Sequence, residues 1–224
     1  LVTFGDALSE PANRAALAFR AAVEDAGWPE VEETSTSLVS AYLRFDPFQT
    51  AHAELQGRLD ALLDSRDWRA APLPAHRRLW RVPTCYNGDH APQLAQAAHA
   101  AGLSRDDAVA SLSAARVRGN TIGFAPGMPY LGELPEAWDI PRLKQLSDNV
   151  PAGALCVAIR QLVLFPRVTP TGWRQIGQTR FTLFQPETAT PFVLKPGDES
   201  TFHAVTAEAR DALSDDPLGG AEAE

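Results

Sequence analysis

Apolar residues recur at helical spacing in two stretches near the start of the chain. Between residues 10 and 26 they fall on one face every three or four positions, which predicts a helix. Ser9 is placed to cap this helix and Gly27 to end it. A second helix is expected after Thr50, which can cap it, and leucines line its inner face.

Strands are expected between these helices. Residues 1–4 resemble the end of an apolar strand, and residues 30–34 and 38–45 predict two more. Strand, helix, strand, strand and helix in this order predict a small α+β sandwich domain. Residues 65–75 combine charged and small residues with two prolines, which is typical of a linker. We therefore expect one domain over residues 1–75 and a second over residues 76–224.

The second domain shows a different pattern, in which short apolar runs alternate with Gly and Pro turns. A strand over residues 79–86 and two short helices over 92–101 and 104–115 come first. Many short strands with turn signals between them predict a β-barrel. A helix over residues 206–213 follows, and the acidic, glycine-rich residues 214–224 are expected to fray. The later strands are expected at residues 121–124, 155–158, 162–165, 172–176, 181–184, 192–194 and 199–204.

Charge and composition exclude several classes of partner. The 224 residues carry a formal net charge of −8, which argues against nucleic acid or an anionic membrane surface as the main partner. No apolar run is long enough to span a bilayer, and no signal peptide is visible over residues 1–5. The two cysteines, Cys85 and Cys156, do not make a disulfide framework, so a reducing cytoplasm is the expected location.

Motifs for metal, nucleotide or serine chemistry are absent from the sequence. The five histidines show no HxxxH spacing, and CxxC, Walker A and GxSxG motifs do not occur. We therefore expect no metal site and no cofactor bound by this chain itself. Cys85 ends an apolar strand, where a buried inert thiol is the expected state.

The most distinctive stretch runs from residue 119 to residue 184 and is dense in turns. Its prolines and glycines fix the backbone, and an aromatic residue stands beside nearly every turn. Rigid loops that carry aromatics often shape a small-molecule pocket, so Phe124, Pro126 and Trp173 are candidate pocket residues. The alternative is that these turns only fold a barrel, with Trp173 in its core.

Polar residues in and near this stretch supply candidate chemistry. Arg142 and Arg174 can each bind a carboxylate through the guanidinium fork, or form surface ion pairs instead. Gln161 can bind an amide or lactam through its own amide. Asp89 can orient His90 for proton transfer, or both can belong to a solvated turn.

Backbone groups are further candidates. The N–H groups of Gly123, Phe124 and Gly153 can polarise a carbonyl as an oxyanion hole does.

Several motifs together resemble a known family. The run GFAPGMPYLGELP is followed by Pro141-Arg142, then VPAG, then TPTGW and IGQT, in that order. This series is similar to allophanate hydrolase subunit 1, also called KipI or the B subunit of prokaryotic 5-oxoprolinase, and to part of the carboxyltransferase region of urea amidolyase. The resemblance implies a cyclophilin-like β-barrel for the second domain, after the α+β N-terminal domain.

The same resemblance implies a function. It indicates a subunit of an ATP-dependent 5-oxoprolinase, which opens 5-oxoproline to glutamate and acts with a homologous C-type (KipA-like) subunit and an A subunit. ATP would be used by the assembled complex, and the substrate would be a small carboxylate with an amide. The alternatives are a urea or allophanate pathway hydrolase, or a KipI-type regulator that inhibits a sensor histidine kinase without catalysis.

The chain departs from the family pattern at polar and glycine positions. The family strand AGxQTGIYP becomes AIRQLVLFP here, so that Ile159, Leu162 and Val163 replace two glycines and a threonine. A histidine that usually precedes the Gly-Phe motif falls on Leu112, and the turn at Pro170-Thr171-Gly172 replaces Pro-Gly-Gly. Added bulk at these positions favours an altered ligand, or binding without turnover.

Overall fold

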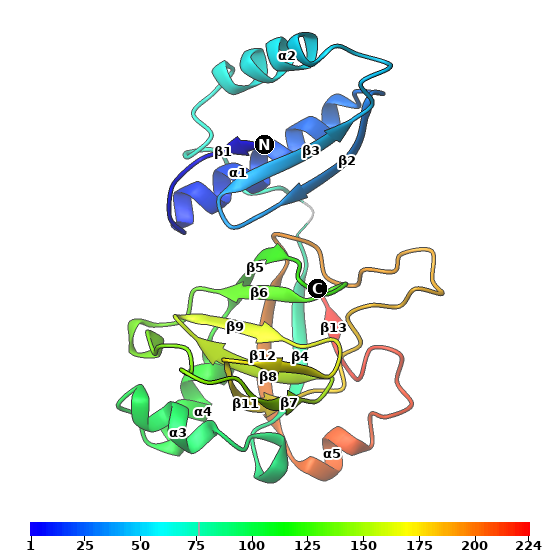
Figure 1. Ribbon diagram of the computed structural model, residues 1–224. Coiled ribbons are helices and arrows are strands. Elements are labelled where there is room, and N and C mark those ends of the chain that lie inside the picture. Colours follow the sequence, from blue (N-terminus) through cyan, green and yellow to red (C-terminus); the bar gives the residue numbers. More distant parts are fainter. Residues whose placement is uncertain (76) are drawn as a thin grey trace. The chain divides into compact units, whose positions relative to one another are not determined.

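The computed structural model describes residues 1–75 and 77–224 (Figure 1). Contacts divide the chain into two compact units, Leu1–His76 and Arg77–Glu224, and the boundary expected from the sequence lay near residue 75. Residue 76, with which the second domain was expected to start, lies outside the described residues.

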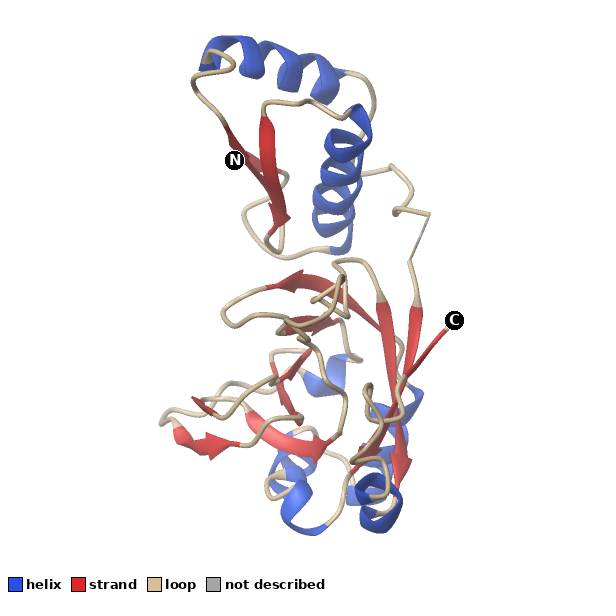
Figure 2. Ribbon diagram, turned by 90° about the vertical axis from the view of Figure 1, so that its right-hand side faces the viewer, coloured by secondary structure: helices blue, strands red, loops and turns tan. Residues whose placement is uncertain are grey.

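The first unit is a three-stranded antiparallel sheet with helices packed against it. The sheet order is β1-β3-β2, and helix α1 covers one face of the sheet (Figures 1 and 2). Phe19 of α1 packs edge-on against Trp68, with ring centres 5.1 Å apart, at the centre of an apolar cluster that α2 also contacts. The elements are β1 (Val2–Thr3), α1 (Glu10–Ala26), β2 (Val31–Thr36), β3 (Ser40–Phe45) and α2 (His52–Asp64).

The ends of α1 and α2 test the capping residues that the sequence predicted. Ser9 accepts a hydrogen bond from the Ala12 N–H, and Gly27 ends α1 in the left-handed conformation, so both predictions are confirmed. The prediction for Thr50 is wrong, because Ala51 is the residue before α2 and no side chain caps that helix. The hydroxyl of Thr50 is instead buried without a hydrogen-bond partner.

The second unit is built on an eight-stranded sheet in the order β11-β8-β9-β6-β5-β12-β4-β13. A further pairing of β11 with β4, between Gln178 and Cys85, closes the sheet into a barrel and leaves β13 outside the ring. The expected fold class, an α+β domain followed by a mainly-β barrel, is thereby confirmed. The strands are β4 (Leu79–Cys85), β5 (Val117–Ile122), β6 (Pro129–Gly132), β7 (Ser147–Val150), β8 (Ala154–Ala158), β9 (Gln161–Leu164), β10 (Thr169–Thr171), β11 (Arg174–Gln178), β12 (Glu199–Val205) and β13 (Glu222–Ala223).

Strand alternation gives the barrel wall two apolar faces. Leu155 and Val157 of β8 join the large inner cluster, to which every barrel strand contributes. Ala154, Cys156 and Ala158 of the same strand belong to a second cluster on the opposite face. Burial raises the pKa of the Cys156 thiol, so this cysteine is inert at neutral pH.

Helices gather at one end of the barrel in both views (Figures 1 and 2). Helix α3 (Leu94–Ala100) contacts β11, and α4 (Arg105–Ala114) contacts β12. Leu112, at the position of the family histidine, is fully buried in the inner cluster and serves the core. The remaining elements are η1 (Gly88–His90), η2 (Glu136–Trp138) and α5 (Ala207–Asp211).

Two expectations for the C-terminal part are wrong. Residues 181–184 and 192–194 form no strands and share only an isolated bridge between Phe184 and Phe192. The C-terminal residues do not fray, since β13 pairs with β4 and the backbone of Glu224 exchanges two hydrogen bonds with Leu79. Prolines at 186 and 191 remove backbone donors near the bridge, which limits strand pairing there.

Candidate functional site

Gln161 and Trp173 lie on the outer face of the barrel wall. Gln161 is buried in β9, opposite Ala158 of β8 and Gly132 of β6. Trp173 precedes β11 and is buried in the outer apolar cluster. Its ring stands edge-to-face with Tyr130, with ring centres 6.2 Å apart. The structure therefore places Gln161 and Trp173 on the same face. Trp173 is part of an apolar cluster, which is the alternative that the sequence analysis considered for it.

Arg142 lies at the protein surface, over the ring of Trp173. The side chain is exposed, and its guanidinium carbon lies 5.8 Å from the centre of the Trp173 ring, within cation–π range. Burial raises the pKa of Tyr130, and the charge of Arg142 opposes that shift. We call Tyr130, Arg142 and Trp173 the aromatic–arginine cluster. It places one exposed cation beside two aromatic rings that pack against each other.

Arg174 differs from Arg142 because it is buried. Only 8% of the residue is exposed, and Nη1 donates to the Pro141 carbonyl oxygen over 2.5 Å. Its Nε is buried without a partner, and no carboxylate of the described residues pairs with this guanidinium. A buried charge without a counter-ion is costly, so Arg174 is suited to an anion supplied from outside the chain.

Phe124 and Pro126 flank Ala125, which packs in the outer apolar cluster with Trp173. Both are exposed in the loop between β5 and β6, and Phe124 is 81% exposed with a positive φ of 70°. The N–H of Gly123 donates to the Met128 carbonyl, and the N–H of Gly153 donates to Phe165. These two N–H groups are therefore occupied, which argues against the predicted oxyanion role.

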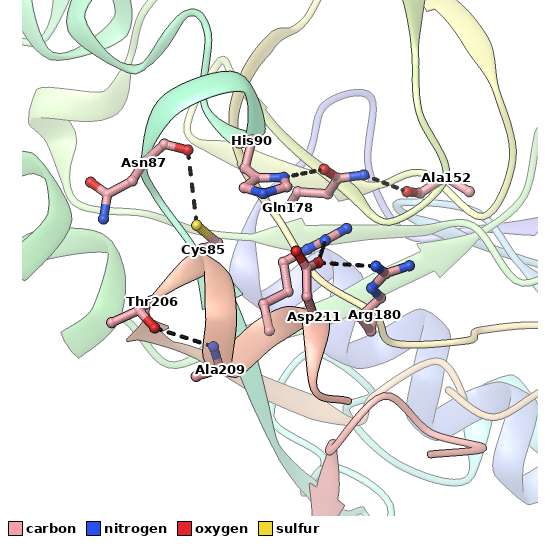
Figure 3. Close-up of polar contacts among 10 residues, drawn as sticks. Cys85, Asn87, His90, Ala152, Gln178, Arg180, Thr206, Ala209 and Asp211 are labelled. Atoms are coloured by element: carbon pink, nitrogen blue, oxygen red, sulfur yellow. Dashed lines mark hydrogen bonds and ion pairs between the residues drawn. The ribbon is translucent and has the colours of Figure 1, made fainter. Parts of the chain in front are cut away.

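His90 is held by two glutamines of β11, Gln178 at its end and Gln175 near its start, and Figure 3 shows the contact with Gln178. Its Nδ1 lies 2.7 Å from Oε1 of Gln178, whose Nε2 donates to the Ala152 carbonyl oxygen over 3.0 Å. Gln175 Nε2 donates to the His90 carbonyl oxygen, also over 3.0 Å. Asp89 is exposed on the same turn, and Gln178, rather than Asp89, is the partner of the imidazole.

A second polar group begins at Arg180, two residues after Gln178, and also contains Arg210 and Asp211; Figure 3 labels Arg180 and Asp211. Asp211 Oδ1 accepts from Arg210 Nη1 at 2.6 Å and from Arg180 Nη2 at 3.0 Å. The bond from Arg180, followed by the charges of both arginines, lowers the pKa of Asp211. Burial, reinforced by the charge of Arg180, lowers the pKa of Arg210. The group therefore carries one positive charge in excess.

Cys85 lies beside this group. It is fully buried, opposite Gln178 in the strand pairing, and its Sγ lies 3.9 Å from the Asn87 carbonyl oxygen. The sequence predicted a buried thiol here, which the structure confirms.

Of the predicted residues, Arg142, Trp173 and Arg174 lie near the start of β11, and His90 lies at its end, whereas Phe124, Pro126 and Gln161 belong to other elements. Arg174 begins that strand and Gln178 ends it, about 13 Å apart at ~3.3 Å per residue. Sequence reasoning missed Tyr130, Gln178, Arg180 and Arg210. Gln178 and Tyr130 carried a sequence signal, since they stand in the IGQT and GFAPGMPYLGELP motifs, whereas the two arginines come together through the fold.

The described residues show no group of three or more His, Cys, Asp or Glu side chains that could hold a metal ion. Their helices are also all too short or too polar to cross a membrane.

Comparison with known proteins adds family information to this geometry. Residues 1–194 match the model of the carboxyltransferase domain, subdomains C and D. The chain is 26% identical to the 5-oxoprolinase B subunit of Bacillus subtilis over 93% of each chain. It is 36% identical to the protein of the same name from Escherichia coli O157:H7, over 64% of this chain and 67% of that protein.

Solved structures give the same result for the fold. A crystal structure of TTHA0988 superposes with a TM-score of 0.77 at 31% identity, covering 92% of this chain but only 39% of the other. This chain therefore spans well under half of TTHA0988. Urea amidolyase of K. lactis shares the fold with a TM-score of 0.70 at 15% identity, over 99% of this chain and 15% of that one. With a family match over residues 1–194, this chain belongs to the family of the carboxyltransferase domain, subdomains C and D.

Proposed function

We propose that this chain is the B-type component of a 5-oxoprolinase complex, which opens 5-oxoproline to glutamate with ATP hydrolysis. Family membership and the relatives named as B subunits of 5-oxoprolinase support this proposal. The structural observation that supports it most is Arg174, a buried guanidinium without a carboxylate partner among the described residues. The substrate carries the carboxylate that such a group requires.

In this proposal the residues near the start of β11 bind the substrate. Arg174 takes the carboxylate, and Arg142, which follows the Pro141 whose carbonyl Arg174 binds, adds a second cation above Trp173. Gln161 lies on the opposite face of the sheet from Arg174, so its predicted contact with the lactam is not part of this arrangement. Opening the ring adds water across the lactam C–N bond, so that the carbonyl carbon gains oxygen and the nitrogen gains a proton. Phosphorylation of the lactam oxygen by ATP would activate this carbon and release ADP. Water would then add to the carbon, and inorganic phosphate and the ring nitrogen would leave it, so that one oxygen from water remains in the new carboxylate.

Partner subunits supply the rest of the complex. The sequence contains no P-loop, so ATP is expected on another subunit. A homologous C-type subunit and an A subunit are the proposed partners, in a cytoplasmic assembly. An allophanate hydrolase would use the same arginines for the carboxylate of allophanate, whereas urea carries no carboxylate for them to bind.

A regulatory binding protein is the second candidate, and one observation favours it. Leu162 and Val163 stand where the family has a threonine and a glycine, and both are fully buried in the two apolar clusters. Val163 lies on the same face of β9 as Gln161, so its side chain fills space there that a glycine would not fill. A chain with a filled pocket would bind a partner, such as a sensor histidine kinase, without turnover.

Reconstitution separates these candidates. The chain is co-expressed with its C-type subunit, the complex is purified, and the A subunit is added for an assay of 5-oxoproline-dependent ATP hydrolysis. Turnover supports the 5-oxoprolinase. A stable complex that turns over neither 5-oxoproline, nor urea, nor allophanate would favour the regulatory binding protein.

A further inference from the structure

The second group of residues, at the helix-covered end of the barrel, has no part in the proposed carboxylate binding by Arg174. We propose that it is a separate binding site for a small oxyanion that carries an O–H or N–H. In this site His90 Nε2 accepts the proton, Gln178 is the positioning residue, and Arg180 and Arg210 attract the negative charge. The inference does not depend on the 5-oxoprolinase assignment.

The orientation of the Gln178 amide is the first step. Its Nε2 lies 3.0 Å from the Ala152 carbonyl oxygen, which can only accept a hydrogen bond. The reverse orientation would bring two oxygens together at that distance. The amide nitrogen therefore faces Ala152, and Oε1 faces His90.

The tautomer of His90 follows from that orientation. An amide oxygen only accepts, so the Nδ1 atom 2.7 Å away must carry the hydrogen and donate it. In the neutral imidazole the lone pair then belongs to Nε2. The backbone of the same residue is fixed as well, because Gln175 Nε2 binds the His90 carbonyl oxygen and the Gln175 N–H donates to Gln93 Oε1.

Such an arrangement is typical of a histidine that exchanges a proton. A histidine in a solvated turn needs no fixed tautomer, whereas a proton acceptor needs its lone pair aimed at the ligand. Here one side chain selects the tautomer and another fixes the backbone. His90 itself is only half-buried, so its ring remains reachable from solvent.

The arginine pair supplies the charge for an anion. Gln178 and Arg180 are two residues apart, and Asp211 is the carboxylate that Arg180 and Arg210 share. The side chain of Arg210 is 5% exposed, and its Nε is buried without a hydrogen-bond partner. Arg180 and Arg210 share one carboxylate, so their remaining donors can bind a small oxyanion, which must compete with the exposed Glu208, on which the charge of Asp211 acts.

The tautomer is tested by ¹⁵N NMR of the imidazoles in the full chain, with His90 assigned from a His90→Gln variant. At a pH where the ring is neutral, the wild-type protein should show the proton on Nδ1. In Gln178→Leu the proton should move to Nε2, while Gln56→Leu, which removes an exposed glutamine from α2, should leave the signal unchanged. A wild-type signal with the proton on Nε2, or one that Gln178→Leu does not alter, overturns the assignment.

The anion is tested with inorganic phosphate, an oxyanion that bears an O–H, at constant pH. We expect the His90 Nε2 resonance to shift along a saturating curve in the wild-type protein. Arg180→Gln should weaken binding at least about tenfold, since one charge-assisted hydrogen bond contributes ~1.5–3 kcal/mol. Arg180 is chosen because it is more exposed than Arg210 and its loss leaves no buried charge unpaired. A linear response equal to that of chloride, or unchanged binding in Arg180→Gln, would show no such site.

Discussion

At the scale of single residues, Asp198 shows how one buried carboxylate joins separate segments. It is 2% exposed and accepts hydrogen bonds from the backbone N–H and guanidinium of Arg78, from Trp80 Nε1 and from the Lys195 N–H. The bond from Arg78 Nη2 measures 2.6 Å, and that guanidinium also stacks 4.9 Å from the centre of the Trp80 ring. The carboxylate thereby fixes the turn before β12 against the start of β4.

Removing this carboxylate should destabilise the barrel strongly. We expect Asp198→Ala to lower the free energy of unfolding by about 3–5 kcal/mol, because four donors lose their acceptor and Arg78 loses its counter-ion. Urea denaturation followed by tryptophan fluorescence measures the change. Asp148→Ala, at an exposed position of β7, should stay within about 0.5 kcal/mol. Equal effects of the two substitutions would contradict this role for Asp198.

Single residues also show the limits of sequence reasoning. Ser9 and Gly27 were predictable because a cap acts within a few positions of chain. Arg174 was predictable as a cation, but its burial depends on segments around Pro141 that the fold brings to it. Gln178 belonged to a recognised motif, yet its bond to His90 joins residues 88 positions apart. Long-range side-chain partners of this kind have no periodic signal.

At the scale of elements, glycines in the turns of the barrel carry specific backbone demands. Gly153 has a φ of 77°, and a Cβ added to it would lie 2.3 Å from the Thr179 carbonyl oxygen. Its N–H donates to the Phe165 carbonyl, and its own carbonyl accepts from the Thr179 N–H. This glycine thus lets the start of β8 approach the backbone that follows β11.

A pair of glycine substitutions tests this requirement. We expect Gly153→Ala to destabilise the protein by at least about 3 kcal/mol, through both the positive φ and the backbone clash. Gly57→Ala should stabilise it by about 0.5–1 kcal/mol, because this glycine lies within α2 and has open space around it. Thermal unfolding of both variants checks the opposite signs. A well-folded Gly153→Ala protein would contradict the close approach.

The C-terminal segment shows why an element can escape sequence reasoning. Its acidic, glycine-rich composition predicted fraying, but Gly219 and Gly220 have positive φ and form a tight turn that returns the chain to β4. Asp216 Oδ1 accepts from the Leu218 and Gly220 N–H groups at 2.8 and 3.0 Å. A side chain that satisfies its own backbone can order a polar segment, which composition alone does not reveal.

Order in this segment should depend on pH through Asp216. The backbone bonds from Gly220 and Leu218 lower its pKa, so the folded value lies below the unfolded value of about 3.9. The contribution is therefore present above about pH 4 and is lost as the pH falls through the folded pKa. At pH 7, Asp216→Ala should weaken the amide protection of Leu79 and Glu224, measured by NMR hydrogen exchange.

Acid should remove the difference between this variant and the wild type. When the pH is below the pKa of Asp216 in the folded protein, the C-terminal segment should detach from β4 to the same extent in the wild type and in Asp216→Ala. The amide chemical shifts of Leu79 and Glu224 measure this. Asp215→Ala, a substitution at the exposed neighbouring residue, is the matched control and should leave both amides protected at pH 7. Loss of protection in Asp215→Ala as well would show that charge, and not the turn, orders the segment.

At the scale of the whole molecule, the sequence predicted the type of each domain, because helices, strands and turns each have a local sequence pattern. Helical periodicity, turn residues and short strands gave an α+β domain and a barrel, which the structure contains. Strand pairing was not predictable, since closure of the barrel joins Gln178 to Cys85 across most of the second unit. The sequence therefore could not show that His90 meets Gln178 at one end of β11 while Arg174 lies at the other.

The central claim is that Arg174 binds the carboxylate of 5-oxoproline in the assembled complex. The most direct test measures 5-oxoproline-dependent ATP hydrolysis by the three-subunit complex with wild-type chain, Arg174→Gln and the exposed control Arg167→Gln, after size-exclusion chromatography has shown equal assembly. We predict that Arg174→Gln raises KM for 5-oxoproline about 10- to 100-fold, in line with ~1.5–3 kcal/mol for hydrogen bonds to a charged group, while Arg167→Gln leaves it unchanged. Unaltered kinetics in Arg174→Gln, or a wild-type complex that assembles without turnover, would contradict the claim.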